Sequence, residues 1–169
     1  YEGGVVWETH ARPPVTVLPP HTENIIVHQK RKLASQIDAR ATIERFMPPK
    51  AGGIHVLHEG LVQVGHKGTL YIAEKSGVPN YTTLFWRPDA PLYRHCDGKR
   101  IRYAYPTETG EEYTLAYVGF QDPVEIIPAG ALARVSLAHW WRPKDDPEIE
   151  LRCYLQISGW FLPQSASLP

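Results

Sequence analysis

Histidine is the residue type in this chain with the widest chemistry, because imidazole can bind a metal ion or move a proton near neutral pH. Among the eight histidines, His55 and His58 form the closest pair, with Glu59 next to them and His66 further on. Residues three apart on a strand point to opposite faces, so this pair fits a metal site only if the strand bends. We therefore interpret the histidines as scattered surface or hydrogen-bonded side chains and expect no metal and no other cofactor.

The same segment resembles the cupin family. His55-Val-Leu-His-Glu-Gly-Leu-Val-Gln-Val is similar to the first cupin motif, in which histidine ligands precede a strand and a Glu-Gly turn, and Ile127-Pro128-Ala129-Gly130 is similar to the second. The resemblance implies a metal-binding β-barrel enzyme or a small-ligand binding protein. The cupin pattern has His-x-His and a histidine shortly after Pro-Ala-Gly, whereas His139 here lies far beyond it. The cupin is therefore the alternative hypothesis.

Other catalytic templates are absent from the sequence. It contains no G-x-S-x-G, no P-loop and no G-x-G-x-x-G motif. The carboxylate pairs Glu111-Glu112 and Asp145-Asp146 fall in predicted loops or exposed positions, whereas acid–base catalysis needs carboxylates in distinct buried environments. We predict that the protein is not an enzyme and has no catalytic residues.

Composition narrows the function classes further. The 169 residues fit one domain, and 43% apolar with 21% charged residues is typical of a globular chain. Eighteen basic and eighteen acidic residues cancel, which removes the usual electrostatic argument for a free nucleic-acid binder. Cys96 and Cys153 could pair or stay free, and we favour two ordinary buried thiols. No apolar run is long enough to span a membrane.

The elements that must position any site begin with an unusual N-terminal segment. Residues 1–34 are predicted to form an extended, proline-rich arm, because Pro13, Pro14, Pro19 and Pro20 cannot donate to a sheet ladder. A free, disordered tail is the alternative. One short helix is predicted from Ile37 to Phe46, capped by Ser35 and stopped at Pro48 and Pro49.

From Gly52 onward the pattern becomes β. Short apolar or alternating runs, such as 54–57, 61–64 and 148–162, are separated by loops rich in Gly, Pro and Asp, and they predict eight or nine strands. No helical pattern alternates with them, so a parallel sheet is not expected. We predict an all-β fold, an eight-stranded antiparallel jelly-roll sandwich over residues 35–162, with a C-terminal tail over 163–169.

This plan resembles the capsid proteins of picorna-like, small icosahedral RNA viruses. Ile37-Asp-Ala-Arg-Ala-Thr-Ile-Glu-Arg-Phe is similar to the short helix before their jelly roll, Phe85-Trp-Arg-Pro to a strand end, and the segment from Glu150 to Leu162 to their last strand. A start without Met suits a subunit released from a polyprotein. The resemblance implies a structural subunit of the virion that assembles with other capsid proteins in the host cytoplasm into an icosahedral shell, with a host receptor as a further partner.

Under this resemblance, interfaces replace a catalytic site. Contacts between subunits are expected from the apolar arm residues and from one of two adjacent tryptophans on the body, since neighbours on a strand face opposite sides. These interface residues are Val15, Val17, Leu18, Trp140 and Trp141. Any contact with viral RNA would be to phosphate groups, independent of base sequence. The residues expected to make it are Lys30, Arg31, Lys32, Lys99, Arg100 and Arg102.

Overall fold

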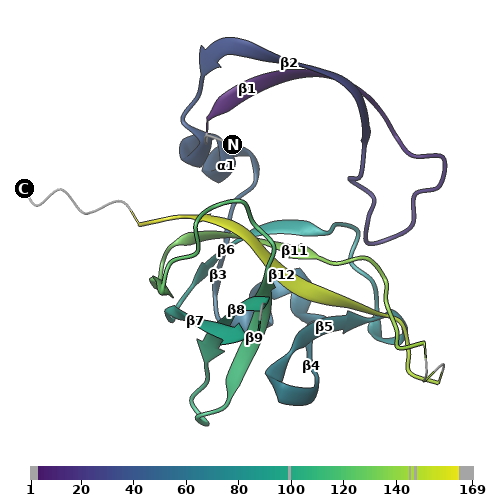
Figure 1. Ribbon diagram of the computed structural model, residues 1–169, viewed down its shortest axis with the longest axis vertical. Coiled ribbons are helices and arrows are strands. Elements are labelled where there is room, and N and C mark those ends of the chain that lie inside the picture. Colours follow the sequence, from purple (N-terminus) through teal and green to yellow (C-terminus); the bar gives the residue numbers. More distant parts are fainter. Residues whose placement is uncertain (1–3, 99, 145, 147, 164–169) are drawn as a thin grey trace, which may run out of the picture.

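The computed structural model describes residues 4–98, 100–144, 146 and 148–163, and it is mostly β, with 46% of residues in strands. The strands are β1 (Val5–Arg12), β2 (Ile26–Gln36), β3 (Lys50–Gly52), β4 (Gln63–Val64), β5 (Leu70–Ala73), β6 (Thr83–Pro88), β7 (Leu92–Asp97), β8 (Arg100–Pro106), β9 (Glu112–Tyr117), β10 (Ile126–Ile127), β11 (Leu132–Leu137) and β12 (Arg152–Phe161). The helical elements are α1 (Ala39–Phe46) and the 3-10 segments η1 (Ile54–Gly60), η2 (His66–Gly68) and η3 (Glu74–Ser76). Figure 1 shows their arrangement.

Most strands belong to one open sheet, here called the body. Its order is β10-β7-β8-β9-β12-β11-β6-β3, with β4 and β5 attached to β12. The neighbours β7, β8 and β9 are antiparallel, whereas β9 and β12 are parallel. Strands β6 and β7 stand near opposite ends of this order, yet only residues 89–91 join them. The sheet must therefore curl until β6 and β7 come together, although its end strands stay unpaired with each other.

Side-chain alternation places the core inside this curl. On β12, Cys153, Leu155 and Ile157 are buried, and the intervening Tyr154 and Gln156 lie half-buried on the outer face. Because successive side chains of a strand point to opposite faces, this pattern separates a packed inner face from an outer face that is free to carry a site.

Two large aromatic side chains fill the centre of the core. Trp86 and Tyr103 are fully buried. The Trp86 indole donates a hydrogen bond of 2.7 Å to the carbonyl oxygen of Gly52, and the Tyr103 hydroxyl donates one of 2.9 Å to that of Val124. Both polar groups are thus satisfied, so the rings contribute their apolar area without an unpaired donor.

The predicted helix is present, with a different cap. The structure has α1 over 39–46, and the side chain of Asp38, not Ser35, accepts a hydrogen bond from the Ala41 amide at 3.0 Å. The helix is fastened to the body by polar contacts. Glu44 accepts from Arg87 at 2.6 Å, and Arg40 donates to the carbonyl oxygen of Leu162 at 2.6 Å.

The eight-stranded jelly roll is not confirmed. A jelly roll packs two antiparallel sheets face to face, whereas the body is one curled sheet that includes the parallel pair β9–β12. The expected strand over 54–57 is also wrong, since this segment forms η1 and the backbone turns at His58 and Glu59, whose φ angles are +44° and +62°. Strand geometry does not extend through such positive φ values.

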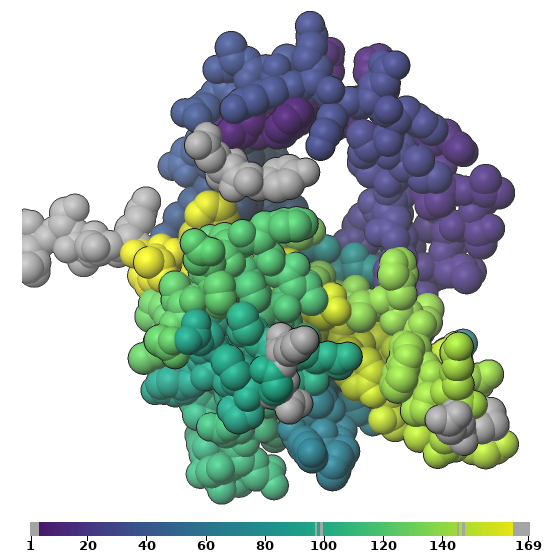
Figure 2. All heavy atoms as spheres, in the orientation of Figure 1, coloured from purple at the N-terminus to yellow at the C-terminus, as the bar shows by residue number. Residues whose placement is uncertain are grey.

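The N-terminal residues that we predict as an arm contain β1 and β2, which pair antiparallel as a separate two-stranded sheet, here called the hairpin. The prolines lie in the connection between the two strands. No residue of β1 or β2 is buried. In Figures 1 and 2 the hairpin arches over the body and touches it only near its two ends.

Both cysteines are free thiols, but only Cys153 is buried, where desolvation raises its pKa to about 12. Cys96 is exposed, contrary to expectation, because it lies near the end of β7 beside a turn. Within the described part of the chain, no helix is long and apolar enough to cross a membrane.

Candidate functional site

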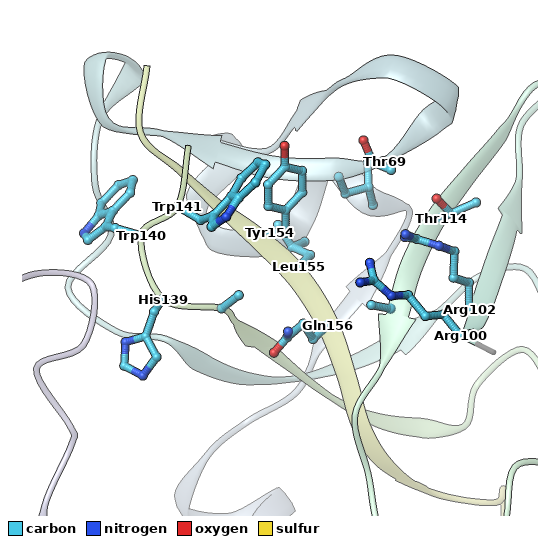
Figure 3. A pocket seen from close by; sticks show the side chains of 13 residues that line it. Thr69, Arg100, Arg102, Thr114, His139, Trp140, Trp141, Tyr154, Leu155 and Gln156 are labelled. Carbon is cyan, nitrogen blue, oxygen red and sulfur yellow. The ribbon is translucent and has the colours of Figure 1, made fainter. Parts of the chain in front are cut away.

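A groove of about 600 Å³ opens on the outer face of the body, where β8, β9 and β12 lie side by side. Figure 3 shows side chains from these strands and from the segment after β11 around it. The lining residues are Thr69, Leu70, Arg100, Arg102, Thr114, Ala116, Ala138, His139, Trp140, Trp141, Tyr154, Leu155 and Gln156.

Strand register explains how the groove forms. Arg102 on β8 pairs with Ala116 on β9, and Ala116 pairs with Gln156 on β12, so these three side chains form one row across the sheet. The methyl group of Ala116 is the smallest of the three, which leaves the middle of the row empty between two long side chains. Arg100 lies two residues before Arg102 and therefore shares its face of β8.

The two arginines supply unpaired positive charge. Among the described residues, neither Arg100 nor Arg102 forms an ion pair, whereas Arg94 pairs with Glu125 and Arg87 with Glu44. A guanidinium presents a planar fork of donors that matches a carboxylate or phosphate group. The groove therefore offers two such forks to an anionic ligand.

Aromatic rings form the opposite wall (Figure 3). Trp141 is 52% exposed and its ring centroid lies 6.0 Å from that of Tyr154. Tyr154 in turn lies 6.0 Å from Tyr71, and the guanidinium of Arg152 lies 4.3 Å from the centre of the Tyr71 ring. Two backbone hydrogen bonds of 2.9 Å between Trp141 and Arg152 fix the Trp141 backbone. The exposed ring is thus held in place beside the groove.

At its far end the groove borders the connection between β1 and β2. The Trp140 indole donates a hydrogen bond of 3.0 Å to the carbonyl oxygen of Pro19. The ring of His139 stacks on that of His21, with centroids 4.6 Å apart. Burial and the neighbouring His139 lower the pKa of His21, which favours the neutral form of the His21 ring in this stack.

The residues predicted to contact phosphate fall into two separate places. Arg100 and Arg102 line the groove, and Lys99 lies outside the described residues. The other three are on β2 of the hairpin, where Arg31 forms an ion pair of 2.6 Å with Glu8. These three are Lys30, Arg31 and Lys32.

The predicted interface residues are also divided. Trp140 packs partly against the core and Trp141 is exposed. Both lie beyond β11, which ends at Leu137, and not within a strand as expected. The three apolar arm residues are all exposed in the connection between β1 and β2. They are Val15, Val17 and Leu18.

The histidines are not brought together. His55 and His66 are exposed, whereas His58 is fully buried beneath Tyr81, with ring centroids 5.5 Å apart. Burial lowers the pKa of His58 to about 4, so its ring is neutral at physiological pH. In the part of the chain that the structure describes, no three His, Cys, Asp or Glu side chains gather in a metal-binding arrangement.

Sequence reasoning missed half of the groove. The alternation of β12 indicates that Tyr154 and Gln156 share a face, but nothing in the sequence indicates that β12 pairs in parallel with β9. Without that register, Ala116 and Gln156 could not be placed beside Arg102.

Comparison with known protein families decides the fold family. The family model of DuOB, the dual OB-containing domain, matches residues 6–160. The chain belongs to this family. No curated protein and no solved structure shows a significant match to this dual OB-containing chain.

The family overturns the capsid hypothesis, together with its virion, shell and polyprotein assignments. The cupin alternative has no support either. The number of strands, a preceding helix and an N-terminal arm are shared by unrelated β folds. These folds differ in which strands pair, and the short segments that carry the resemblance contain no information on strand pairing.

The OB architecture accounts for the sheet order. An OB fold is a five-stranded, partly open Greek-key barrel. If β6 and β7 are taken as one bent first strand, then β8, β9, β11 and β12 follow as strands two to five of this dual OB-containing chain. The groove then lies on strands two and three, beside the connection from strand four to strand five, which carries His139, Trp140 and Trp141.

Proposed function

We propose that the groove binds a single-stranded nucleic acid. One observation carries the proposal: two unpaired guanidiniums, on Arg100 and Arg102, face the exposed ring of Trp141 across one groove. Single-stranded nucleic acids are bound by positive charge along the backbone and by aromatic rings on which bases stack. The position on strands two and three adds support, because OB folds bind oligonucleotides and oligosaccharides there.

Charge favours a nucleic acid over a neutral oligosaccharide. Among the described residues the groove holds no carboxylate and no thiol, while it holds two arginines. A neutral sugar would leave both guanidiniums without a charged partner, whereas each phosphate of a nucleic acid can accept two hydrogen bonds from one guanidinium.

The chain's zero net charge is compatible with this proposal because the relevant charge is local. Two phosphate contacts predict a salt slope of about −1.4 in log–log form, so that a tenfold rise in salt weakens binding about 25-fold. Stacking on aromatic rings adds about 1–3 kcal/mol per base and does not depend on salt in this way. We therefore expect stacking to contribute at least as much as charge.

Fluorescence anisotropy with a labelled single-stranded oligonucleotide tests the proposal. The variant Arg100→Gln/Arg102→Gln is expected to weaken binding about tenfold or more, since charge-assisted hydrogen bonds are lost, and to flatten the salt slope. Trp141→Ala is expected to weaken binding with the slope unchanged. The matched control is Arg45→Gln, because Arg45 is exposed on α1, away from the groove. Equal binding by wild type and all three variants would contradict the proposal.

A further inference from the structure

The hairpin is held by its ends rather than along its length. At one end, a hydrogen bond of 2.9 Å from the Ile37 amide to the carbonyl oxygen of Gly4 closes the hairpin, and the adjoining α1 is fixed to the body by Arg40 and Glu44. Between the two ends, none of the residues of β1 and β2 is buried. A hairpin that packed on the body would bury one of its faces.

The other end is fastened by residues 19–23, here called the clasp. Pro19 accepts the hydrogen bond from Trp140, and the His21 ring stacks on His139. The hydroxyl of Thr22 donates to the carbonyl oxygen of Asn80. The Glu23 carboxylate accepts from the backbone amides of Thr82 and Thr83 at 2.7 and 2.9 Å. The clasp is thus held mainly by polar and stacking contacts, and Pro20 is its buried residue.

An opening remains between the two fastened ends. Figure 2 shows it as a gap between the spheres of the hairpin and those of the body. The chain borders this gap continuously, because it leaves the clasp along β2, descends through α1 and enters the body at β3. Hairpin and body together therefore form a ring around the opening. The polypeptide chain makes up the rest of this ring, and the clasp closes it by non-covalent contacts.

The groove leads to this ring. His139 and Trp140 line the groove, and they also line a second hollow of about 540 Å³ between the body and the connection that carries the clasp. A chain that lies along Arg102 and Trp141 and continues past Trp140 therefore arrives beneath the hairpin.

The hairpin itself carries groups suited to such a chain. Trp7 pairs with Lys32 across the two strands, and the ammonium group of Lys30 lies 5.2 Å from the centre of the Trp7 ring, so these three share one face. Trp7 is 39% exposed. Aromatic and basic side chains in combination are again the chemistry of a single-stranded nucleic acid.

We propose that a bound nucleic-acid strand runs from the groove through the opening, so that hairpin and body encircle it and the clasp closes the ring. This inference rests on the proposed function. It has a topological consequence: a linear strand can thread through a closed ring, whereas a circular strand enters only if the clasp opens.

Covalent closure of the clasp tests the ring. Thr22 and Asn80 are exposed and in contact, so the variant Thr22→Cys/Asn80→Cys can be joined by a short bis-maleimide, with Cys96→Ser removing the exposed native thiol. The joined residues 22–80 then form a covalent circle around the opening. The control pair is Arg94→Cys/Glu125→Cys in the same background, because these two side chains touch within the body.

The probes are a circular and a linear single-stranded oligothymidylate of equal length. Protein joined before mixing is expected to bind the linear probe as wild type does and the circle at least tenfold more weakly. Protein joined after mixing with the circle is expected to stay attached in denaturing gels until a nuclease cuts the DNA. The control pair is expected to show neither effect.

Two results would contradict the ring, and they distinguish a failure of the ring from a failure of the proposed function. If wild type binds both probes but joining the clasp neither excludes the circle nor traps it, the strand lies outside the ring and the inference is wrong while the proposed function stands. If wild type binds neither probe, the proposed function itself fails.

Discussion

The body and the hairpin are both built from β-strands, but they are stabilised by different means. In the body, side chains such as Trp86, Leu155 and Ile157 are removed from water completely. In the hairpin no side chain is buried, and its position depends on backbone pairing and on the polar contacts at its ends. Because an isolated two-stranded hairpin is marginally stable in water, the hairpin can loosen as a unit while the body stays folded.

The largest expected effect comes from the body. Trp86→Ala removes a fully buried ring and is expected to cost about 3–5 kcal/mol, which lowers the melting temperature by roughly 6–20 °C. Trp7→Ala in the hairpin is expected to lower the free energy of unfolding by less than about 1 kcal/mol. Calorimetry of both variants measures this difference between body and hairpin. Similar losses for both would show that the hairpin contributes to the same cooperative core.

Acid is expected to act on the body through His58. Its pKa is about 4 when folded and about 6.5 when unfolded. Between pH 6.5 and 4 the unfolded state therefore binds a proton at His58 that the folded state does not bind. The free energy of unfolding is greatest above pH 6.5 and falls by about 3 kcal/mol in total as the pH drops toward 4. Urea unfolding between pH 7.5 and 4.5 is expected to show this loss in wild type and much less of it in His58→Leu. The exposed control His66→Leu should behave as wild type, and an unchanged slope in His58→Leu would contradict the assignment.

A smaller and more local effect is expected at the clasp. Glu23→Ala removes the acceptor for the amides of Thr82 and Thr83 and is expected to cost about 1–2 kcal/mol. Hydrogen exchange should rise at these two amides and along β2, with no change at Ile157 in the core. Glu8→Ala serves as the control, since its ion pair with Arg31 is exposed and is expected to contribute less than about 1 kcal/mol. Faster exchange throughout the core of Glu23→Ala would mean that hairpin and body unfold together.

The smallest effect is expected at the tip of the hairpin connection. Val15 is 93% exposed, so Val15→Ser is expected to change the free energy of unfolding by less than about 0.5 kcal/mol. Thermal unfolding measures it directly. A clear loss of stability would show that this connection is packed in solution, and the contrast between the two regions would weaken.

The sequence predicts those features that depend on near neighbours. Alternation at Cys153, Leu155 and Ile157 predicts a strand with one buried face, and the helix before Pro48 is found within two residues of its predicted start. The positive φ angles of His58 and Glu59 are not predictable from the sequence, because neither residue type requires this conformation. The prolines predict an extended arm over 1–34, whereas residues 26–36 form β2 and pair with β1.

In the candidate site, too, the sequence predicts what depends on residue type but not what depends on strand pairing. The charge of Arg100 and Arg102 predicts phosphate contact, and both lie in the groove. Of Trp140 and Trp141 the sequence predicts only that one contacts another protein subunit, whereas both line the groove. Tyr154 and Gln156 were not selected, because their place beside the arginines depends on the pairing of β12 with β9, which joins distant parts of the chain.

The parallel pairing of β9 with β12 also makes the groove depend on the last strand of the chain to be synthesised. The floor of the groove is the seam where Ala116 meets Gln156, and contacts between residues so distant in sequence form late because the entropy of closing the intervening loop must be overcome first. A chain emerging from the ribosome therefore has no groove until its last strand is made. If the groove binds nucleic acid as proposed, truncation before β12 is expected to abolish binding, because the truncated chain lacks Gln156 and the β9–β12 pairing.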